Sequence, residues 1–238
     1  MKMDETKPKF IHLHTHSHYS LLDGLSKTKD LIELAKKFKM PAMAITDHGN
    51  MYGAIEFYKM AKKEGIKPII GVEAYIAERT RLDKEFGIDN KRYHLTLLAK
   101  NIEGYKNLIR LVTISNTEGY YYKPRMDKEI LKKYSDGLIC LSGCLGGELS
   151  HAIANKDETK AEKIIKEHQE IFGKENYFIE IQCHPHVEND EYVRKTLIAL
   201  AKKYNIPIVA TQDSHYPCSD DHEAHHTLLQ INTQGDSK

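Results

Sequence analysis

Short apolar runs alternate with amphipathic segments along nearly the whole chain. The apolar runs predict strands at 9–13, 42–46, 67–72, 93–99, 137–141, 177–182 and 206–210. Apolar residues at helical spacing predict helices at 28–39, 53–64, 101–116, 157–172, 188–204 and 219–230. Strands that alternate with helices through short loops favour right-handed crossovers and a parallel sheet. The pattern therefore predicts an α/β fold, a barrel of seven strands rather than the usual eight.

The same pattern gives no sign of a second domain. A chain of 238 residues suits one large barrel, and no linker or internal repeat interrupts it before about residue 217. We therefore expect a single domain over 1–238. The polar stretch 75–92 is expected to form a long surface loop.

Composition excludes several classes of function but does not identify one. The chain is 40% apolar and 29% charged with a net charge of +1, so any contact with nucleic acid must be local. No apolar run approaches the roughly 20 residues that cross a bilayer, and the first residues lack the apolar core of a signal peptide. We expect a cytoplasmic protein without membrane contact. Its four cysteines, which are expected to be reduced thiols or metal thiolates, are Cys140, Cys144, Cys183 and Cys218.

Four alternating histidines follow the first apolar run: His12, His14, His16 and His18. In an extended segment alternate side chains share a face, so His12, His14 and His16 are expected to project together. Neutral imidazole is the commonest metal donor in proteins. Because Leu13 and Thr15 interrupt the run, a metal site explains it better than an affinity tag does.

Other metal-competent residues follow the remaining strands, where barrels of this class gather their chemistry. They stand in Thr46-Asp47-His48-Gly49, Gly71-Val72-Glu73, Ser142-Gly143-Cys144, His184-Pro185-His186 and Asp213-Ser214-His215. Imidazole, carboxylate and thiolate together favour Zn²⁺, Mn²⁺ or Fe²⁺ over Mg²⁺ or Ca²⁺. The candidates outnumber the ligands of one four-coordinate ion, so two or three ions are expected. Metal ions about 3.5–4 Å apart suit phosphoester hydrolysis.

Several blocks resemble the PHP (polymerase and histidinol phosphatase) family: His12–Ser17, Thr46–Met51, Gly71–Ile76 and Asp213–His215. Further runs are similar to the members of that family that belong to bacterial replicative DNA polymerases: Tyr19–Gly24, Lys67–Glu73, Pro124–Asp127 and Gly143–Cys144. The resemblance extends over essentially the whole chain. It implies a distorted seven-stranded TIM-like barrel, the PHP fold, with a trinuclear metal centre.

Carried over motif by motif, the resemblance implies nine metal ligands: His14, His16, Asp23, His48, Glu73, His94, Cys144, Asp213 and His215. Glu73 would bridge two ions. His14, His16 and Asp213 would complete one ion, His94 and Cys144 a second, and Asp23, His48 and His215 a third. His12 stands where many members have Asp and is expected outside the ligand set.

Glu73, Asp213 and His215 are the expected catalytic residues. His94 conflicts with the strand pattern, since it lies near the start of its strand rather than at the end.

The implied activity is metal-dependent phosphodiester hydrolysis, a 3′–5′ exonuclease that proofreads DNA during replication. The implied cofactors are two to three divalent ions, Zn or Mn, with Fe as a further option. The implied partners are the DNA 3′ end, the remainder of the polymerase subunit and other replicase subunits. The nucleotidyl-transfer site of such a polymerase would lie outside this chain, and residues 217–238 would begin the connection to it.

Three alternatives stay open. One is a metal-bound structural module without turnover, since metal binding can supply folding energy. Another is a small-molecule phosphatase of the histidinol-phosphate type. The third is a peptidase, because His222-Glu223-Ala224-His225-His226 matches HExxH, although little chain follows it.

A last signal is the stretch Tyr120-Tyr121-Tyr122-Lys123-Pro124-Arg125, which mixes aromatic and cationic residues. It is typical either of a packed loop, which we favour, or of a stacking platform for single strands. Lys123, Arg125 and Arg92 could form a local basic edge that holds a DNA backbone.

Overall fold

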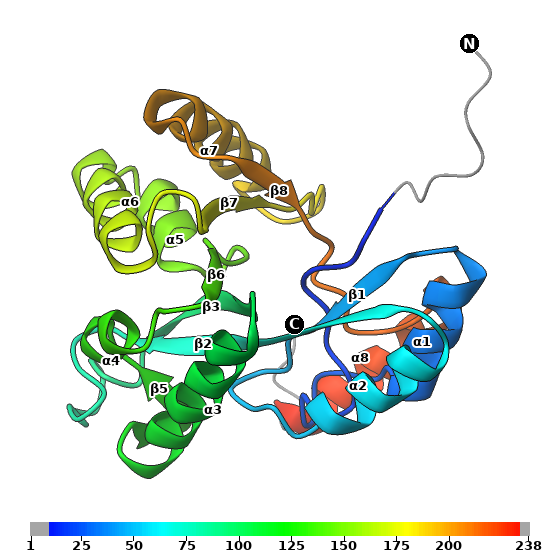
Figure 1. Cartoon of the computed structure of the whole chain (residues 1–238). Helices are drawn as coiled ribbons and strands as arrows, with labels where there is room; N and C mark the ends of the chain where they lie inside the picture. Colours follow the sequence, from blue (N-terminus) through cyan, green and yellow to red (C-terminus); the bar gives the residue numbers. More distant parts are fainter. Residues whose placement is uncertain (1–9, 234–238) are drawn as a thin grey trace.

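The computed structural model describes residues 10–233, so residue 9 of the first expected strand and residues 234–238 lie outside the described part. A curled sheet forms the centre of the molecule and helices cover its outer face (Figure 1). The strands are β1 (Ala42–Ile45), β2 (Lys67–Ala77), β3 (Arg92–Ala99), β4 (Tyr120–Tyr121), β5 (Lys123–Met126), β6 (Leu138–Leu141), β7 (Tyr177–Ile181) and β8 (Ile208–Ala210). The helices are α1 (Thr28–Lys37), α2 (Ala54–Lys63), α3 (Ile102–Thr117), α4 (Lys128–Lys133), α5 (Glu148–Ala154), α6 (Glu158–Phe172), α7 (Asp190–Tyr204), the 3₁₀ turn η1 (Ser219–Asp221) and α8 (His222–Asn232).

The barrel runs through β1, β2, β3, β6, β7 and β8, and β4 and β5 form a hairpin beside the far end of β2. Residues 12–16, which we call the closing segment, complete the ring. Thr15 bridges Ser214 beyond β8, and Thr46 N donates to Thr15 O over 2.9 Å beyond β1. The fold is thus a distorted seven-membered α/β barrel. The expected strand 9–13 is wrong within its described part, because residues 10–13 form no regular strand.

β3 runs against both of its neighbours. It is antiparallel to β2 and to β6, whereas the pairs β1–β2, β6–β7 and β7–β8 are parallel. The expectation of an all-parallel sheet is therefore wrong at this strand. The physical reason is the connection 78–91, which contains no helix and so makes no crossover. The expected loop 75–92 is also too long, since β2 extends to Ala77 and β3 begins at Arg92.

The longer helices follow from amphipathic spacing and caps. In α6 the buried residues recur every three or four positions, so one face meets the sheet. The Asp157 side chain accepts a hydrogen bond from Lys160 N and begins that helix, which ends at Gly173 with a φ of 81°. The helices expected at 28–39, 53–64, 101–116, 157–172 and 188–204 all form, within two residues at each end.

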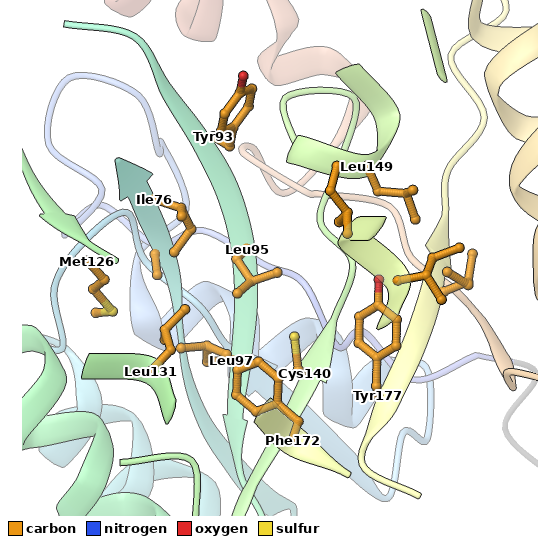
Figure 2. Close-up of a cluster of buried hydrophobic side chains, with 14 of the residues drawn as sticks. Ile76, Tyr93, Leu95, Leu97, Met126, Leu131, Cys140, Leu149, Phe172 and Tyr177 are labelled. Carbon is orange, nitrogen blue, oxygen red and sulfur yellow. The ribbon is translucent and has the colours of Figure 1, made fainter. Parts of the chain in front are cut away.

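Strand alternation separates the core from the barrel interior. Val72, Ala74 and Ile76 of β2 face outward into the main hydrophobic cluster, beneath the covering helices. Figure 2 shows this cluster, in which Leu97, Cys140 and Tyr177 from three neighbouring strands pack with Phe172 of α6. A second cluster lies between α1, α2 and β1. The other face of β2 is left for polar residues inside the barrel.

Candidate metal centre

Glu73 stands at the middle of the site, on the inner face of β2. It is 1% exposed, and its register partner on β3 is Thr96. The next inward pair along the two strands is Tyr75 with His94. Because β3 is antiparallel to β2, the start of β3 lies beside the end of β2. This removes the conflict over His94, which reaches the same rim from the opposite strand direction.

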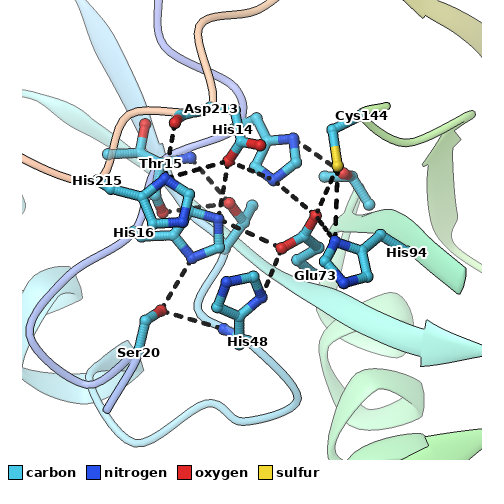
Figure 3. Close-up of polar contacts among 12 residues, drawn as sticks. His14, Thr15, His16, Ser20, His48, Glu73, His94, Cys144, Asp213 and His215 are labelled. Atoms are coloured by element: carbon cyan, nitrogen blue, oxygen red, sulfur yellow. Dashed lines mark hydrogen bonds and ion pairs between the residues drawn. The ribbon is translucent and has the colours of Figure 1, made fainter. Parts of the chain in front are cut away.

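Two histidines of the closing segment point their Nε2 atoms at Glu73 and Asp213 (Figure 3). His14 Nε2 lies 3.3 Å from Glu73 Oε1 and 3.2 Å from Asp213 Oδ1. His16 Nε2 lies 3.4 Å from Glu73 Oε2 and 3.0 Å from Asp213 Oδ1. Both rings are fully buried. His12 belongs to none of the clusters among the described residues, and its ring packs against Phe10 instead.

Hydrogen bonds on the other ring nitrogens fix these orientations. His14 Nδ1 donates to Glu180 Oε1 over 2.7 Å. His16 Nδ1 donates to Ser20 Oγ over 2.9 Å, and Ser20 Oγ in turn donates to Asp47. With the ring proton on Nδ1, each neutral ring would offer the Nε2 lone pair, the form that a metal ligand needs.

A second group of donors surrounds the other side of Glu73. His94 Nδ1 lies 2.9 Å from Glu73 Oε1, and Cys144 Sγ lies 3.5 Å from both of these atoms. His48 Nδ1 lies 2.6 Å from Glu73 Oε2. Cys144 comes from the loop after β6, as expected.

The third group lies toward the surface. His48 Nε2 is 2.8 Å from Asp23 Oδ2, and His215 Nε2 is 3.6 Å from the same oxygen. The ring of His16 lies between those of His48 and His215, with centroid separations of 4.2 and 4.1 Å. The structure thus brings all nine predicted ligands into one constellation.

The donor set fits metal ions. The donor atoms form three groups, and within each group they all lie within 4.8 Å of one another. The groups are His14, His16, Glu73 and Asp213; His48, Glu73 and His94; and His16, His48 and His215. Several buried atoms in these groups have no hydrogen-bond partner among the described residues: His14 Nε2, His16 Nε2, His48 Nδ1, Glu73 Oε2 and Asp213 Oδ1. Buried polar atoms without partners are costly, and cations at these points would satisfy them together.

In the absence of a cation the donors differ in protonation. Burial opposes a charge on His14 and His48, but the surrounding carboxylates outweigh it, holding the pKa of His14 well above its usual value and raising that of His48 to about 10. Burial and the neighbouring His48 lower the pKa of His16 to about 3, so its ring is neutral. Burial alone would raise the pKa of Glu73, but His94, His48 and His14 outweigh it and hold that pKa well below its usual range. Burial and Glu73 raise the pKa of Cys144, so its thiol needs a cation to become a thiolate.

Sequence reasoning missed Glu180 of β7. Its side chain is fully buried and accepts hydrogen bonds from His14 and from Thr211 Oγ1, the latter over 2.5 Å. The available signal was a lone carboxylate in the apolar run Tyr177–Ile181, since buried carboxylates require partners.

One expected rim motif, His184-Pro185-His186, and the HExxH match supply no donor to the clusters among the described residues. His184 bonds to Gln182 and lines a cavity beside the centre. His222 and His226 of the HExxH match are exposed on α8 and join no metal-competent group in residues 10–233. Between them, His225 donates to the Asp23 carbonyl.

Comparisons with known proteins identify the family of the chain. Residues 12–184 match the family model described as PHP domain. The chain is 46% identical over 229 residues to the DNA polymerase III subunit alpha of Borreliella burgdorferi, which covers 95% of this chain and 20% of that protein. It is 47% identical over 233 residues to the same subunit of Thermus aquaticus, covering 96% and 19%. The chain thus spans about a fifth of the length of these relatives.

Solved structures support the fold. An amidohydrolase from Chromobacterium violaceum superposes with a TM-score of 0.54 at 14% identity, covering 92% of this chain and 96% of that one. A two-domain protein of Bacteroides vulgatus with a predicted PHP-like metal-dependent phosphoesterase gives a TM-score of 0.54 at 16% identity, covering 90% and 55%. No helix within residues 10–233 is long and apolar enough to span a membrane. With its barrel, its clustered donors and these matches, the chain belongs to the PHP domain family.

Proposed function

We propose that this chain is a metal-dependent phosphodiesterase that removes nucleotides from the 3′ end of DNA, as part of a replicative polymerase subunit. The observation that carries the proposal is the overlap of three donor groups through Glu73, His16 and His48. Overlapping groups suit two or three ions, whereas a structural site usually closes around one. Bound Zn²⁺ or Mn²⁺ would activate water and neutralise the phosphate oxygens.

The protein's own residues set where the substrate would meet this centre. Asp213 and His215 belong to the donor groups, and they also line an adjoining cavity of about 440 Å³. Its other lining residues include His184, Gln212 and Tyr216, so the wall offers hydrogen-bonding groups and an aromatic ring. This volume lies in the range of small-ligand pockets, about 300–1,000 Å³. We assign the terminal nucleotide to this cavity, and catalytic roles to Glu73, Asp213 and His215.

The reaction would be a hydrolysis without a covalent protein intermediate. Water oxygen forms a bond to phosphorus, the bond from phosphorus to the preceding 3′ oxygen breaks, and that oxygen takes up a proton. DNA as the substrate is supported by the likeness to DNA polymerase III subunit alpha. Work inside a replicase would place the chain in the cytoplasm, with the rest of the subunit and other replicase subunits as partners.

The test is hydrolysis of 3′-labelled single-stranded DNA by the metal-loaded chain, with Mn²⁺ or Zn²⁺, beside Asp213→Ala. We expect release of single nucleotides that needs the metal and falls by about 100-fold or more in Asp213→Ala, because residues that only support a ligand already contribute about 10–100-fold. Asp136→Ala, an exposed aspartate outside the clusters, is the matched control and should keep full activity.

Two results would decide against the proposal. No release, with bound metal verified by elemental analysis, would leave a structural metal module. Faster hydrolysis of a small phosphomonoester such as p-nitrophenyl phosphate than of DNA would favour a small-molecule phosphatase.

A further inference from the structure

Two cationic side chains converge on the ring of Tyr75, immediately beside the donor groups. Arg92 Cζ lies 5.5 Å and Lys123 Nζ lies 5.8 Å from the centroid of that ring. The same ring stacks on His48 at 5.7 Å and 15°, and it meets His94 edge-on at 5.4 Å. One aromatic ring therefore separates the Arg92/Lys123 pair from two candidate metal ligands.

The pair has no acidic partner among residues 10–233. Arg79, Arg81, Arg110 and Arg194 all form ion pairs with carboxylates, whereas Arg92 donates only to the Asn90 carbonyl. Lys123 likewise forms no ion pair within the described chain, whereas Lys128 in the same region pairs with Glu148 and Glu167. The positive charge of the pair is thus available to an anion from outside.

The expected basic edge at this place needs one correction. Arg125 is fully buried, and its guanidinium donates to the carbonyls of Gly119, Asp89, Arg81 and Asp83. It holds the 78–91 loop against β5 and cannot reach a ligand. The stretch 120–125 is therefore neither wholly packed nor a loop: it forms the β4–β5 hairpin, in which Arg125 is buried while Tyr120 and Tyr122 are more than half exposed. Lys123 is the cation of this stretch that forms no ion pair within the described chain.

The backbone positions of the pair are fixed relative to the donor groups by strand pairing and by packing. Arg92 is the first residue of β3, in register with Ala77 of β2. Lys123 lies in the β4–β5 hairpin, next to Pro124. A Cβ added at Gly49 would come within 2.8 Å of Pro124 Cγ, so the turn after His48 packs closely on this hairpin. Glycine is required there, since its φ is 61°.

The pair and the cavity lie at the two ends of one row of rings. The row runs from Tyr75 to His48 to His215, with centroid separations of 5.7 and 5.6 Å, and the buried His16 ring packs against both histidines (the histidines are visible in Figure 3). Arg92 and Lys123 flank the Tyr75 end, and the cavity of Asp213 and His215 opens at the other. A strand whose scissile phosphate lies over the row would thus place its last nucleotide in the cavity and its preceding phosphates on the pair.

We propose that Arg92 and Lys123 form a phosphate-binding site for the retained part of a single nucleic-acid strand. This inference rests on the proposed function for the direction of the strand, but its binding step does not require turnover. Cationic side chains near an aromatic platform are typical of sequence-independent strand binding.

The test compares the double variant Arg92→Gln/Lys123→Gln with the double variant Lys106→Gln/Arg110→Gln on the outer helix α3. Both remove two positive charges. Binding of 5′-fluorescein oligothymidylate is measured by anisotropy, with Asp213→Ala added to every protein to prevent cleavage. We expect Kd to rise at least about tenfold for the site variant and to stay unchanged for the α3 variant. The slope of log Kd against log salt should fall by about 1.4, at about 0.7 for each lost phosphate contact.

A second measurement separates phosphate binding from damage to the centre. Thymidine 5′-(p-nitrophenyl phosphate) carries one phosphodiester and no preceding phosphate, so its KM and kcat should be equal in the site variant and the unchanged chain. Equal oligothymidylate Kd and salt slope in both double variants would overturn the inference, as would the absence of oligothymidylate binding. A third outcome is that the unchanged chain binds oligothymidylate but hydrolyses no DNA, and that only the Arg92→Gln/Lys123→Gln variant binds more weakly. This result would uphold the phosphate site and refute only the proposed exonuclease.

Discussion

At the scale of single residues, Glu180 is a buried carboxylate that belongs to none of the donor groups among the described residues but contacts a candidate ligand, His14. Within residues 10–233 its only ion-pair partner is His14 Nδ1, at 2.7 Å, and Thr96, Gln182 and Thr211 donate hydrogen bonds to it. A carboxylate that accepts from the far nitrogen of a ligating histidine fixes the ring and raises its basicity. We therefore regard Glu180 as a positioning residue for His14.

Replacing Glu180 with Gln should weaken metal binding while the fold is retained. The amide keeps one acceptor for His14 but loses the negative charge, so we expect affinity for Zn²⁺ to fall about 10–100-fold. Competition with a chromogenic chelator measures this. Glu170→Gln, on the exposed face of α6, is the matched control and should leave affinity unaltered. Equal affinities in both variants would show that Glu180 serves packing alone.

The nine candidate ligands could be named from the sequence because they stand in short blocks that resemble a known family. Glu180 could not, since its role depends on a partner 166 positions away in the chain. His94 looked misplaced for a different reason. Strand position predicts a site residue only if the strand direction is known, and the direction of β3 was inferred from a rule that this connection breaks.

At the scale of elements, the first turn of α3 lies in close contact with the backbone of Gly137, the residue that precedes β6. The first turn of α3 contains Gly104, and a Cβ there would lie 1.8 Å from the Gly137 carbonyl oxygen. Lys100 N also donates to that oxygen over 2.8 Å, so the hydrogen bond holds the Gly137 carbonyl in place against the helix. The helix can approach this loop only because residue 104 has no side chain.

Gly104→Ala should therefore destabilise the chain, against the usual trend for helices. In an open helix this change gains about 0.5–1 kcal/mol. Here overpacking should cost about 1–3 kcal/mol of unfolding free energy instead, measured by urea denaturation. Asn116→Ala on the exposed face of the same helix should stay within about 0.5 kcal/mol. A stabilised Gly104→Ala protein would mean that α3 moves away at little cost.

Long periodic helices were predictable because their spacing and caps are local features. The short elements β4, β5, α4 and α5 were not, since two to seven residues carry too little periodicity. Tertiary contacts decide them instead. The β4–β5 hairpin, for example, is fixed by the buried Arg125 and by the register of Tyr75 with Arg125.

At the scale of the whole molecule, the barrel closes through few backbone bonds. Between the closing segment and the residues after β8, His16 N donates to Ser214 O over 2.8 Å, and Ser214 N donates to His14 O over 3.4 Å. Candidate ligands lie on both sides of this junction: His14 and His16 on one, Asp213 and His215 on the other. An ion held by both sides would link them across the junction.

Removing metal should therefore lower global stability. At a free ion concentration about 100 times Kd, binding contributes about 2.7 kcal/mol, which is about 5–10 °C in Tm for a domain of this size. Differential scanning calorimetry with and without a chelator measures the shift. Asp213→Ala, which loses a donor at the junction, should show a smaller shift. The same Tm with and without metal would show that bound ions do not stabilise the closed barrel.

The junction also bears on how the polypeptide is made. His14 and His16 are separated from Asp213 by about 200 residues of chain. At ribosomal rates of roughly 5–20 residues per second, their partners follow about 10–40 s later. During that interval β1 and β2 can pair, whereas His14 and His16 still lack Asp213 and His215, the donors from beyond β8. The group of His14, His16, Glu73 and Asp213 therefore cannot be complete until Asp213 has been synthesised, whereas His48, Glu73 and His94 are all present much earlier.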